Sequence, residues 1–594
     1  LDPFGGAVTG IVGVNRDTIG FGLGAKPILN TYGFCLADPA RNVPLYKGAG
    51  KTQPMLSARR IFDGVVAGVN SGGNCSGIPT PQGFLYFDPR YRGKPLVFVG
   101  TIGLIPEKEK GKKLYVKKAR PGDCIVMAGG RVGLDGIHGA TFSSEALSAG
   151  SPATAVQIGD PITQKKLSDA IVKEARDLGL YTSITDNGAG GLSCSVAEMA
   201  KESGGCIVHL EKVPLKYQGL APWQIWISES QERMTLSVPK KSWKRFSSLM
   251  KDRAVEATVI GTFTRSGKCV VRYKNKTVMD VDMHFLHDGF PKEHLHSKPV
   301  IRKHSEPDYK EKLSYTSGFL QLIGRKNISG FSFLSQQYDH EVQGSSVTKP
   351  LQGRGRVNAD ATVSRPVLSC QKGLVLSSGL ASSYGDIDMY ASVAAAIDTA
   401  VCACVVAGAD PDRIAILDNF CWCNGRDPER LYELKRAAHA CYDTAVAYGT
   451  PFISGKDSMY NDFVGFDASD KPVTISIPPT VLISALGILD DCAAAMTLDA
   501  KIPGDSVYVL GDTFDELGGS EWYAQLGAVG NLVPRVRPAK HIRLYRTYYT
   551  LLKHNLLVSG KSVGRGGLAV ALAKTALGGL LGMNLVLKTL PGNA

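Results

Sequence analysis

Acidic side chains stand beside glycines and apolar runs in the first half of this sequence. Asn15-Arg16-Asp17 lies inside a Gly-rich apolar stretch, and Asp186 follows the apolar run 180–184. An arginine can hold a phosphate group through its planar fork of donors, and carboxylates at the ends of strands suit Mg²⁺. Two simpler interpretations stay open: Arg16 and Asp17 could form an internal ion pair, and Asp186 could cap a helix.

Amide and hydroxyl side chains occur in two further segments of the first half. Gln157 lies at what we interpret as the end of a strand, just before the Gly-Asp-Pro turn 159–161. Its amide could bind a substrate amide or phosphate, or could only cap the turn. Glu229-Ser230-Gln231 is a polar run between apolar ones, which is typical either of a binding segment or of a solvated turn.

The second half repeats this pattern of strand ends and polar loops. Asp418 follows the apolar run 414–417, which predicts a strand that ends there. A second strand is expected to end at the loop Gly455-Lys456-Asp457-Ser458. Each segment is weak evidence when taken singly. Together they place acids, amides and glycines at the ends of several strands, which is what a phosphate site in an α/β protein requires.

An internal duplication must position these residues. Asp123 and Gly136 are 13 positions apart and flank an apolar run, and Asp505 and Gly518 repeat the spacing about 380 residues later. Both runs predict a strand followed by a Gly-rich loop. The pattern predicts two homologous α/β modules, each with α+β layers, facing one another as a pseudo-dimer.

Two pairs of expected helices support the duplication. Segments 9–27 and 390–411 each end in a Gly-Ala-x-Pro sequence, which stops a helix. Small residues at helical spacing follow Gly190-Gly191 and Gly566-Gly567. The expected boundaries are a first unit at 1–107 and 108–265, a connecting region at 266–355, and a second unit at 356–497 and 498–594.

Composition narrows the class of protein and its partners. The chain has 594 residues, 44% of them hydrophobic, and a net charge of +14. The basic residues are dispersed, so we expect no nucleic-acid partner. We see no apolar stretch of 18 or more residues, so we expect no membrane helix. Thirteen scattered cysteines are typical of reduced thiols, which predicts a cytoplasmic protein.

Eight segments, taken in order, carry a resemblance to a known family. They read GGAVTGIVGVNRD, GNCSGIPTPQG, GIHGATF, VQIGDP, SESQERM, YGDID, DNFCW and TPFISGKDSMYND. The chain resembles the phosphoribosylformylglycinamidine synthase family over nearly its whole length. The resemblance implies two tandem units of the aminoimidazole-ribonucleotide-synthetase-like fold. It also implies a carbon-nitrogen ligase of purine biosynthesis that uses ATP, Mg²⁺ and ammonia from glutamine to convert formylglycinamide ribonucleotide into the amidine.

The resemblance also implies roles for individual residues. Substrate contacts are expected at Arg16, Gln157, Glu229, Ser230, Gln231 and Ser458. Nucleotide contacts are expected at Asp418, Gly455 and Lys456, and metal ligands at Asp17, Asp186 and Asp457. Many members of the family carry a metal-binding Asn where this chain has Lys456, so Asp457 is the expected replacement. His138 lies in a family loop near the site and is as compatible with a structural role.

Departures from the family leave other interpretations open. The resemblance places a His-rich segment with the general base before Leu1, so we expect no catalytic base within 1–594 and no turnover by these residues alone. We see no glutaminase motif, so ammonia is expected from a fused region or a separate glutaminase subunit. The second-unit counterpart of Asp186 is Ser562. A non-catalytic nucleotide-binding relative, or another ATP enzyme of the superfamily such as a selenophosphate synthetase, stays possible.

Overall fold

The first unit begins with two helices packed on a small sheet. The computed structural model describes residues 2–151, 156–157, 159–308, 310 and 312–593. Helix α1 (Pro3–Ile19) packs on α2 (Ala58–Cys75), and both cover a three-stranded sheet of order β4-β1-β5. Strand β1 (Lys26–Leu36) pairs parallel with β4 (Gln82–Phe87) and antiparallel with β5 (Leu96–Leu104).

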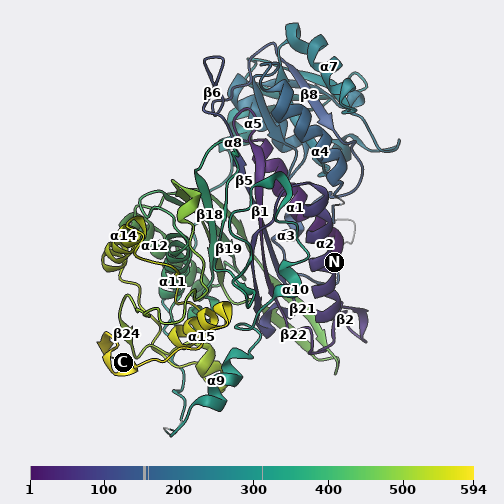
Figure 1. Ribbon diagram of the computed structural model, residues 1–594. Helices are drawn as coiled ribbons and strands as arrows, with labels where there is room; N and C mark the ends of the chain where they lie inside the picture. The colour runs from purple at the N-terminus through teal and green to yellow at the C-terminus, as the bar shows by residue number, and fades with distance from the viewer. Residues whose placement is uncertain (1, 152–155, 158, 309, 311, 594) are drawn as a thin grey trace.

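The first unit continues into a separate seven-stranded sheet, which stands at the top of Figure 1. Its order is β14-β13-β10-β12-β8-β11-β9. The strands are β8 (Cys124–Gly129), β9 (Ser183–Asp186), β10 (Cys206–His209), β11 (Arg233–Val238), β12 (Ala257–Phe263), β13 (Lys268–Tyr273) and β14 (Lys276–Asp282). We assigned residues 268–282 to the connecting region, but β13 and β14 complete this sheet instead.

Two helices cover opposite faces of the seven-stranded sheet. Side chains alternate along a strand, so Val126 and Ala128 face α4 (Pro161–Ala170) while Ile125 and Met127 face α5 (Leu192–Ser203). The central strand β8 is therefore buried on both sides, which explains its continuous apolar run. Shorter elements complete this unit: β6 (Lys108–Glu109), β7 (Lys112–Lys113), α3 (Gly139–Ser143), α6 (Pro222–Ile227), α7 (Trp243–Asp252) and α8 (Met283–Asp288).

The second unit is built around a five-stranded sheet of order β17-β18-β23-β19-β20. Helices α11 (Met389–Val406), α12 (Pro428–Tyr448) and α14 (Pro538–Lys553) pack together on this sheet, to the left in Figure 1. The strands are β17 (Ala361–Ser364), β18 (Gly373–Gly379), β19 (Ile414–Cys421), β20 (Phe452–Ser458) and β23 (Thr480–Leu489). Strands β19 and β20 are parallel, as β1 and β4 are in the first unit.

Helix α11 bears on the expectation that no helix spans a membrane. By length and composition alone this helix could cross a membrane, with a mean hydropathy of 1.8. However, 67% of its residues are buried inside the protein. It packs against β18 and β23 on one side and against α12 and α14 on others, so its apolar surface serves the core of the second unit.

The duplication predicted from the sequence is present in the backbone. Gly24 and Gly408, at matching positions after α1 and α11, both adopt left-handed φ angles, of +107° and +119°. The helices end earlier than expected, at Ile19 and Val406, and each Gly lies in the turn that follows. The second pair of helices also exists, as α5 and α15 (Gly567–Gly579).

The second copy departs from the prediction after residue 504. We expected a strand in 505–510 to match β8, but this segment is irregular and mostly exposed. The unit ends with elements that form no larger sheet among the described residues: β24 (Thr513–Phe514), α13 (Glu521–Gln525), α15 and β25 (Gly592–Asn593). Without a paired neighbour, the apolar run alone does not make a strand.

The two units share strands and a core. Strand β2 (Leu45–Gly48) of the first unit pairs with β21 (Asp462–Asp467) of the second, in a four-stranded sheet of order β22-β21-β2-β3. Buried Tyr91 makes a 2.8 Å hydrogen bond with Thr480 across the units. The remaining elements are β3 (Thr52–Pro54), β22 (Pro472–Ser476), α9 (Thr316–Ile323), α10 (Ser332–Ser335), β15 (Leu351–Gln352) and β16 (Val357–Asn358).

A glycine at the end of β18 allows α11 to approach the sheet. A Cβ atom on Gly379 would lie 1.9 Å from the Ala396 carbonyl oxygen, which is backbone and cannot rotate away. We expect Gly379→Ala to lower the free energy of unfolding by about 1–3 kcal/mol, measured as a fall in Tm. Gly6→Ala is the control, because a Cβ on Gly6 meets no atom within 4 Å. An unchanged Tm for Gly379→Ala would contradict this close packing.

Candidate active site

Arg16 on α1 is the buried cation of the site. Its side chain is 3% exposed, donates a 2.5 Å hydrogen bond from a terminal nitrogen to Gln231 Oε1, and lies 3.7 Å from Asp186 Oδ2. Its Nε is buried and has no hydrogen-bond partner among the described residues. A buried donor without a partner is costly, so Arg16 is arranged to meet a further acceptor, such as a phosphate oxygen.

Asp17 and Asp186 are brought together from different subdomains. Asp17 is the next residue on α1, whereas Asp186 ends β9 of the seven-stranded sheet, and α1 reaches the junction between the two (Figure 1). The pKa of Asp17 is raised to about 6, first by burial and then by the Asp186 carboxyl, while Arg16 and Lys456 oppose the rise. Two carboxyls forced together in this way are the donor set that a divalent cation would bind.

Glu229 organises the amides of the site. Its Oε1 accepts a 3.0 Å hydrogen bond from Gly190 N, and its Oε2 accepts one of 2.6 Å from Gln157 Nε2 and one of 3.0 Å from Ala140 N. Gln231 Nε2 donates to Gln157 Oε1 and to the Glu229 carbonyl. Burial raises the pKa of Glu229, and these donors oppose that rise. Arg16, Gln157, Glu229 and Gln231 are therefore one connected network.

Two interpretations of these segments are corrected by the structure. Glu229-Ser230-Gln231 is buried, so it is not a solvated turn. Gln157 does not end a strand in the described part of the chain; it lies in an irregular segment before α4, and Ile158 lies outside the described residues. Ser230 turns away from the amide network, because its hydroxyl donates to Asp135 at 2.8 Å and accepts from Gly133 N at 2.9 Å.

The second unit contributes the tips of two parallel strands. Asp418 of β19 pairs in register with Gly455 of β20, and both strands continue to Cys421 and Ser458. The polar residues expected to form loops after these strands are therefore part of the strands themselves. A Cβ on Gly455 would lie 2.6 Å from Asp418 Oδ1, so glycine leaves the Asp418 carboxylate uncovered. Burial raises the pKa of Asp418, and the charge of Asp457 adds to this.

Both units meet around β20. Lys456 lies close enough to Asp17 for its charge to lower the pKa of that carboxyl. Ser458 Oγ donates a 3.1 Å hydrogen bond to the carbonyl of Ser143, in the first unit. Lys94 also donates to this carbonyl, at 3.1 Å. Asp457 has no hydrogen bond or ion pair with Asp17 or Asp186 in the described chain, so its expected metal role stays a prediction.

A buried acid beside the amide network, Glu232, was not expected from the sequence. Glu232 is 6% exposed, has a left-handed φ of +59°, and accepts a 2.9 Å hydrogen bond from Asp160 N. It thus ties the segment after Gln157 to the segment that carries Gln231. In the sequence, the charged pair Glu232-Arg233 just before an apolar run could have indicated a buried acid. We interpreted it as the end of the polar run instead.

The described part of the second copy lacks a matching pair of carboxyls. Ser562, the counterpart of Asp186, donates a 2.7 Å hydrogen bond to Asp360, which also pairs with Lys561. A hydroxyl thus stands where the first copy has the Asp186 carboxyl, and the acid beside it, Asp360, is paired with an ammonium. Burial would raise the pKa of Asp360, but the charge and hydrogen bond of Lys561 and the hydrogen bond of Ser562 lower it overall. This acid is therefore already paired within the protein.

Glu232 gives the protein a testable pH dependence. Burial raises its pKa from 4.5 to about 7, so the folded state prefers the neutral carboxyl. The contribution of Glu232 to the free energy of unfolding is therefore fully present below about pH 4.5, and it is lost as the pH rises through about 7. Glu232→Gln keeps an acceptor for Asp160 N but carries no charge. We expect this variant to be more stable than the native protein at pH 8, by on the order of 2 kcal/mol.

The measurement is Tm at pH 8 and at pH 5, where the difference should shrink. Glu256→Gln is the control, because Glu256 is exposed and paired with Arg131. A Glu232→Gln variant that is less stable at pH 8 would show that the ionised carboxylate is the favoured form.

Comparison with known proteins places the site within a family. Residues 1–105 match the family described as AIR synthase related protein, N-terminal domain, and residues 120–274 match its C-terminal domain. The phosphoribosylformylglycinamidine synthase subunit PurL of Thermoplasma volcanium is 32% identical over 98% of this chain and 74% of its own length. That of Methanocaldococcus jannaschii is 34% identical over 98% and 76%. This chain belongs to the PurL family.

Solved PurL structures share the fold. PurL of T. maritima complexed with FGAR has a TM-score of 0.63 and 26% identity, and covers 84% of this chain and 72% of its own. The ATP complex of the same protein has a TM-score of 0.60 and 25% identity, over 83% and 70%. Two AIR-synthase-like units, as predicted from the sequence, are therefore confirmed as the architecture of this PurL-family chain. The individual site roles stay predictions.

Proposed function

We infer that this chain is the ATP-dependent ligase that converts formylglycinamide ribonucleotide to formylglycinamidine ribonucleotide in purine biosynthesis. The membership in the PurL family supports the reaction, and relatives of the same fold have been solved with FGAR and with ATP. The observation that carries the assignment is the network of Arg16, Gln231, Gln157 and Glu229 beside the Asp17–Asp186 pair.

The reaction divides into two transfers. The γ-phosphoryl group of ATP passes to the amide oxygen of the substrate and releases ADP. Ammonia then adds to the activated carbon, and phosphate leaves. We propose that Arg16, whose Nε is buried with no hydrogen-bond partner in the described chain, holds the ribose phosphate, and that the amides of Gln157 and Gln231 orient the substrate. Asp418 and Gly455 offer an open carboxylate and a close backbone for the nucleotide.

Mg²⁺ fits the acids of this site. Asp17 and Asp186 are close enough to raise the pKa of Asp17, a repulsion that a bound cation would relieve. No group of three or more His, Cys, Asp or Glu side chains that could hold a metal is found in the described ranges, so the nucleotide phosphates would supply further oxygen ligands. When bound, the metal neutralises phosphate charge. Lys456 adds a protein cation near the same acids.

Ammonia is proposed to reach this chain from a glutaminase, either as a separate subunit or as a fused region. A PurLQS structure from Thermotoga maritima matches this chain at a TM-score of 0.62 and 25% identity, which supports an assembly of several subunits. We also propose a cytoplasmic location, which the thirteen free cysteines support.

The substrate assignment is tested by binding. Arg16→Lys keeps the charge but loses the planar fork, so we expect the affinity for formylglycinamide ribonucleotide to fall about tenfold or more by calorimetry. Arg59→Ala is the control, because Arg59 is exposed on α2 and pairs with the exposed Asp63. The Tm of both variants confirms folding. Equal affinities for Arg16→Lys and the native chain would remove Arg16 from the substrate site.

The reaction is tested by ADP release. We expect the complete enzyme to form ADP only when formylglycinamide ribonucleotide and ammonia are both present, in a coupled assay at saturating ATP. Asp186→Asn should lower this rate and raise the Mg²⁺ concentration needed for half-maximal activity. ADP release that ignores the substrate, or nucleotide binding without any turnover, would instead favour the non-catalytic relative or a different enzyme of the superfamily.

A further inference from the structure

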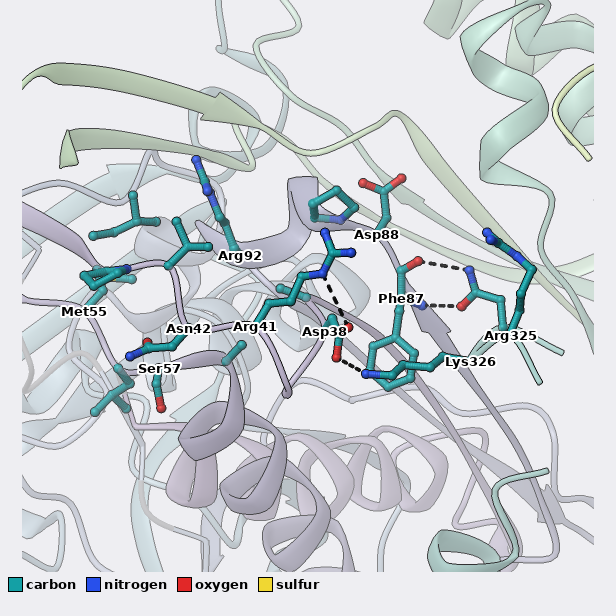
Figure 2. A pocket seen from close by; sticks show the side chains of 18 of the residues that line it. Asp38, Arg41, Asn42, Met55, Ser57, Phe87, Asp88, Arg92, Arg325 and Lys326 are labelled. Carbon is teal, nitrogen blue, oxygen red and sulfur yellow. Dashed lines mark hydrogen bonds and ion pairs between the residues drawn. The ribbon is translucent and has the colours of Figure 1, made fainter. Parts of the chain in front are cut away.

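A second cavity, of about 710 Å³, opens in the first unit away from the catalytic residues. It is lined by residues just after β1 and β4, by residues on either side of the β2–β3 hairpin, and by the segment 324–327, which carries Arg325 and Lys326 (Figure 2). None of the residues to which we assigned a substrate, nucleotide or metal role lines it. Its volume is in the range of small-molecule sites.

The walls of this cavity are held in place by specific contacts. Asn327 brackets Phe87 at the end of β4: its Oδ1 accepts from Phe87 N at 2.7 Å and its Nδ2 donates to Phe87 O at 3.0 Å. Asn327 also donates to Glu521 at 2.9 Å, and Arg325 pairs with Glu521 at 2.6 Å. Three distant parts of the chain are thereby fixed around one space, so the cavity exists before any ligand enters.

The charges around the cavity leave arginine in excess. Each of its acids is already bound: Glu521 by Arg325, Asp38 by Lys326, and Asp88 by two donors of Arg90.

Two arginines remain. Arg92 has no hydrogen bond or ion pair with an acid in the described chain. Arg41 approaches the already paired Asp38 only at 3.9 Å and is 81% exposed. In Figure 2, Arg41 lies between Asn42 and Met55 on one side and the Asp38–Lys326 pair on the other. An entering anion would meet Arg92, which has no acidic partner in the described chain, and Arg41, whose one acidic partner there is already held by Lys326.

The remaining lining is apolar. Val43 and Leu56 are 51% and 42% exposed, and Pro44, Met55 and Phe87 line the same space. Exposed apolar side chains beside uncommitted arginines suit a ligand with a charged end and an uncharged body. A phosphate monoester carries nearly two negative charges at neutral pH, which matches two arginines better than a single carboxylate does.

We propose that this cavity is a second ligand site, which binds the phosphate monoester of a small molecule through Arg41 and Arg92 and its ring against Val43, Met55 and Leu56. The bound molecule could be a nucleoside monophosphate or a sugar phosphate, since both present the same group. The site uses residues that the ligase reaction does not, so it does not depend on the proposed function.

The proposal is tested by calorimetry with three probes: AMP, ribose 5-phosphate and inorganic phosphate. We expect AMP or ribose 5-phosphate to bind the native chain, and the double variant Arg41→Gln, Arg92→Gln to weaken binding about tenfold or more. Val43→Trp should also weaken it, by filling the apolar side without removing charge. Arg546→Ala is the matched control, because Arg546 is half-exposed, pairs with Asp412 and lies outside the cavity.

The outcomes separate this site from the catalytic one. Arg16→Lys should leave binding at the cavity unchanged. If Arg16→Lys weakens the probe and the double variant does not, the molecule binds in the catalytic cleft and the proposal is wrong. Absence of binding by all three probes at millimolar concentration would also overturn it. A preference for AMP identifies a nucleotide site, and equal binding of ribose 5-phosphate identifies a sugar-phosphate site. The Tm of each variant confirms that it folds.

Discussion

The meeting of Asp17 and Asp186 is the constraint on which the site depends. Like charges in a buried place repel, and the raised pKa of Asp17 records this cost. The two acids are held together because α1 belongs to both cores: Val8 and Ile11 pack in the core of the first subdomain, and Ile19 packs in one core with Ile184 of β9. Arg16 and Lys456 offset part of the repulsion from opposite units. The acids are thus held ready for a cation, and the amide network next to them is rigid because Glu229 is bound by three donors.

The duplicated scaffold has been used asymmetrically. Both copies keep a parallel strand pair and a left-handed glycine after the first long helix. Only the first copy has the carboxyl pair; in the second, Asp360 is satisfied by Ser562 and Lys561. The second unit instead contributes strand β20 to the first unit's site, where Ser458 Oγ donates a hydrogen bond to the carbonyl of Ser143. One site therefore needs both copies, which gives the pseudo-dimer a functional reason to persist.

Much of this arrangement could be predicted from local patterns. Gly-rich spacing revealed the duplication, and short polar segments revealed Arg16, Asp17, Asp186 and Gln231. Local patterns failed where pairing decides structure. The run 505–510 has the composition of a strand but finds no neighbour, whereas Asp418 continues a strand because β20 and β23 pair with it along its whole length. Glu232 escaped notice because its burial and its bond to Asp160 are long-range facts.

The sequence by itself determined the chemistry of the side chains, the order of the elements and the membership in a family, because these follow from residue types and their spacing along one chain. Only the tertiary structure decided which of those side chains share a space. Asp17 and Asp186 are far apart in the chain, and so are Lys456 and Asp17; their proximity arises from packing between units. The charge balance around Arg41 and Arg92 likewise depends on the distant segment 324–327, where Lys326 pairs with Asp38 and Arg325 pairs with Glu521. No local pattern contains that information.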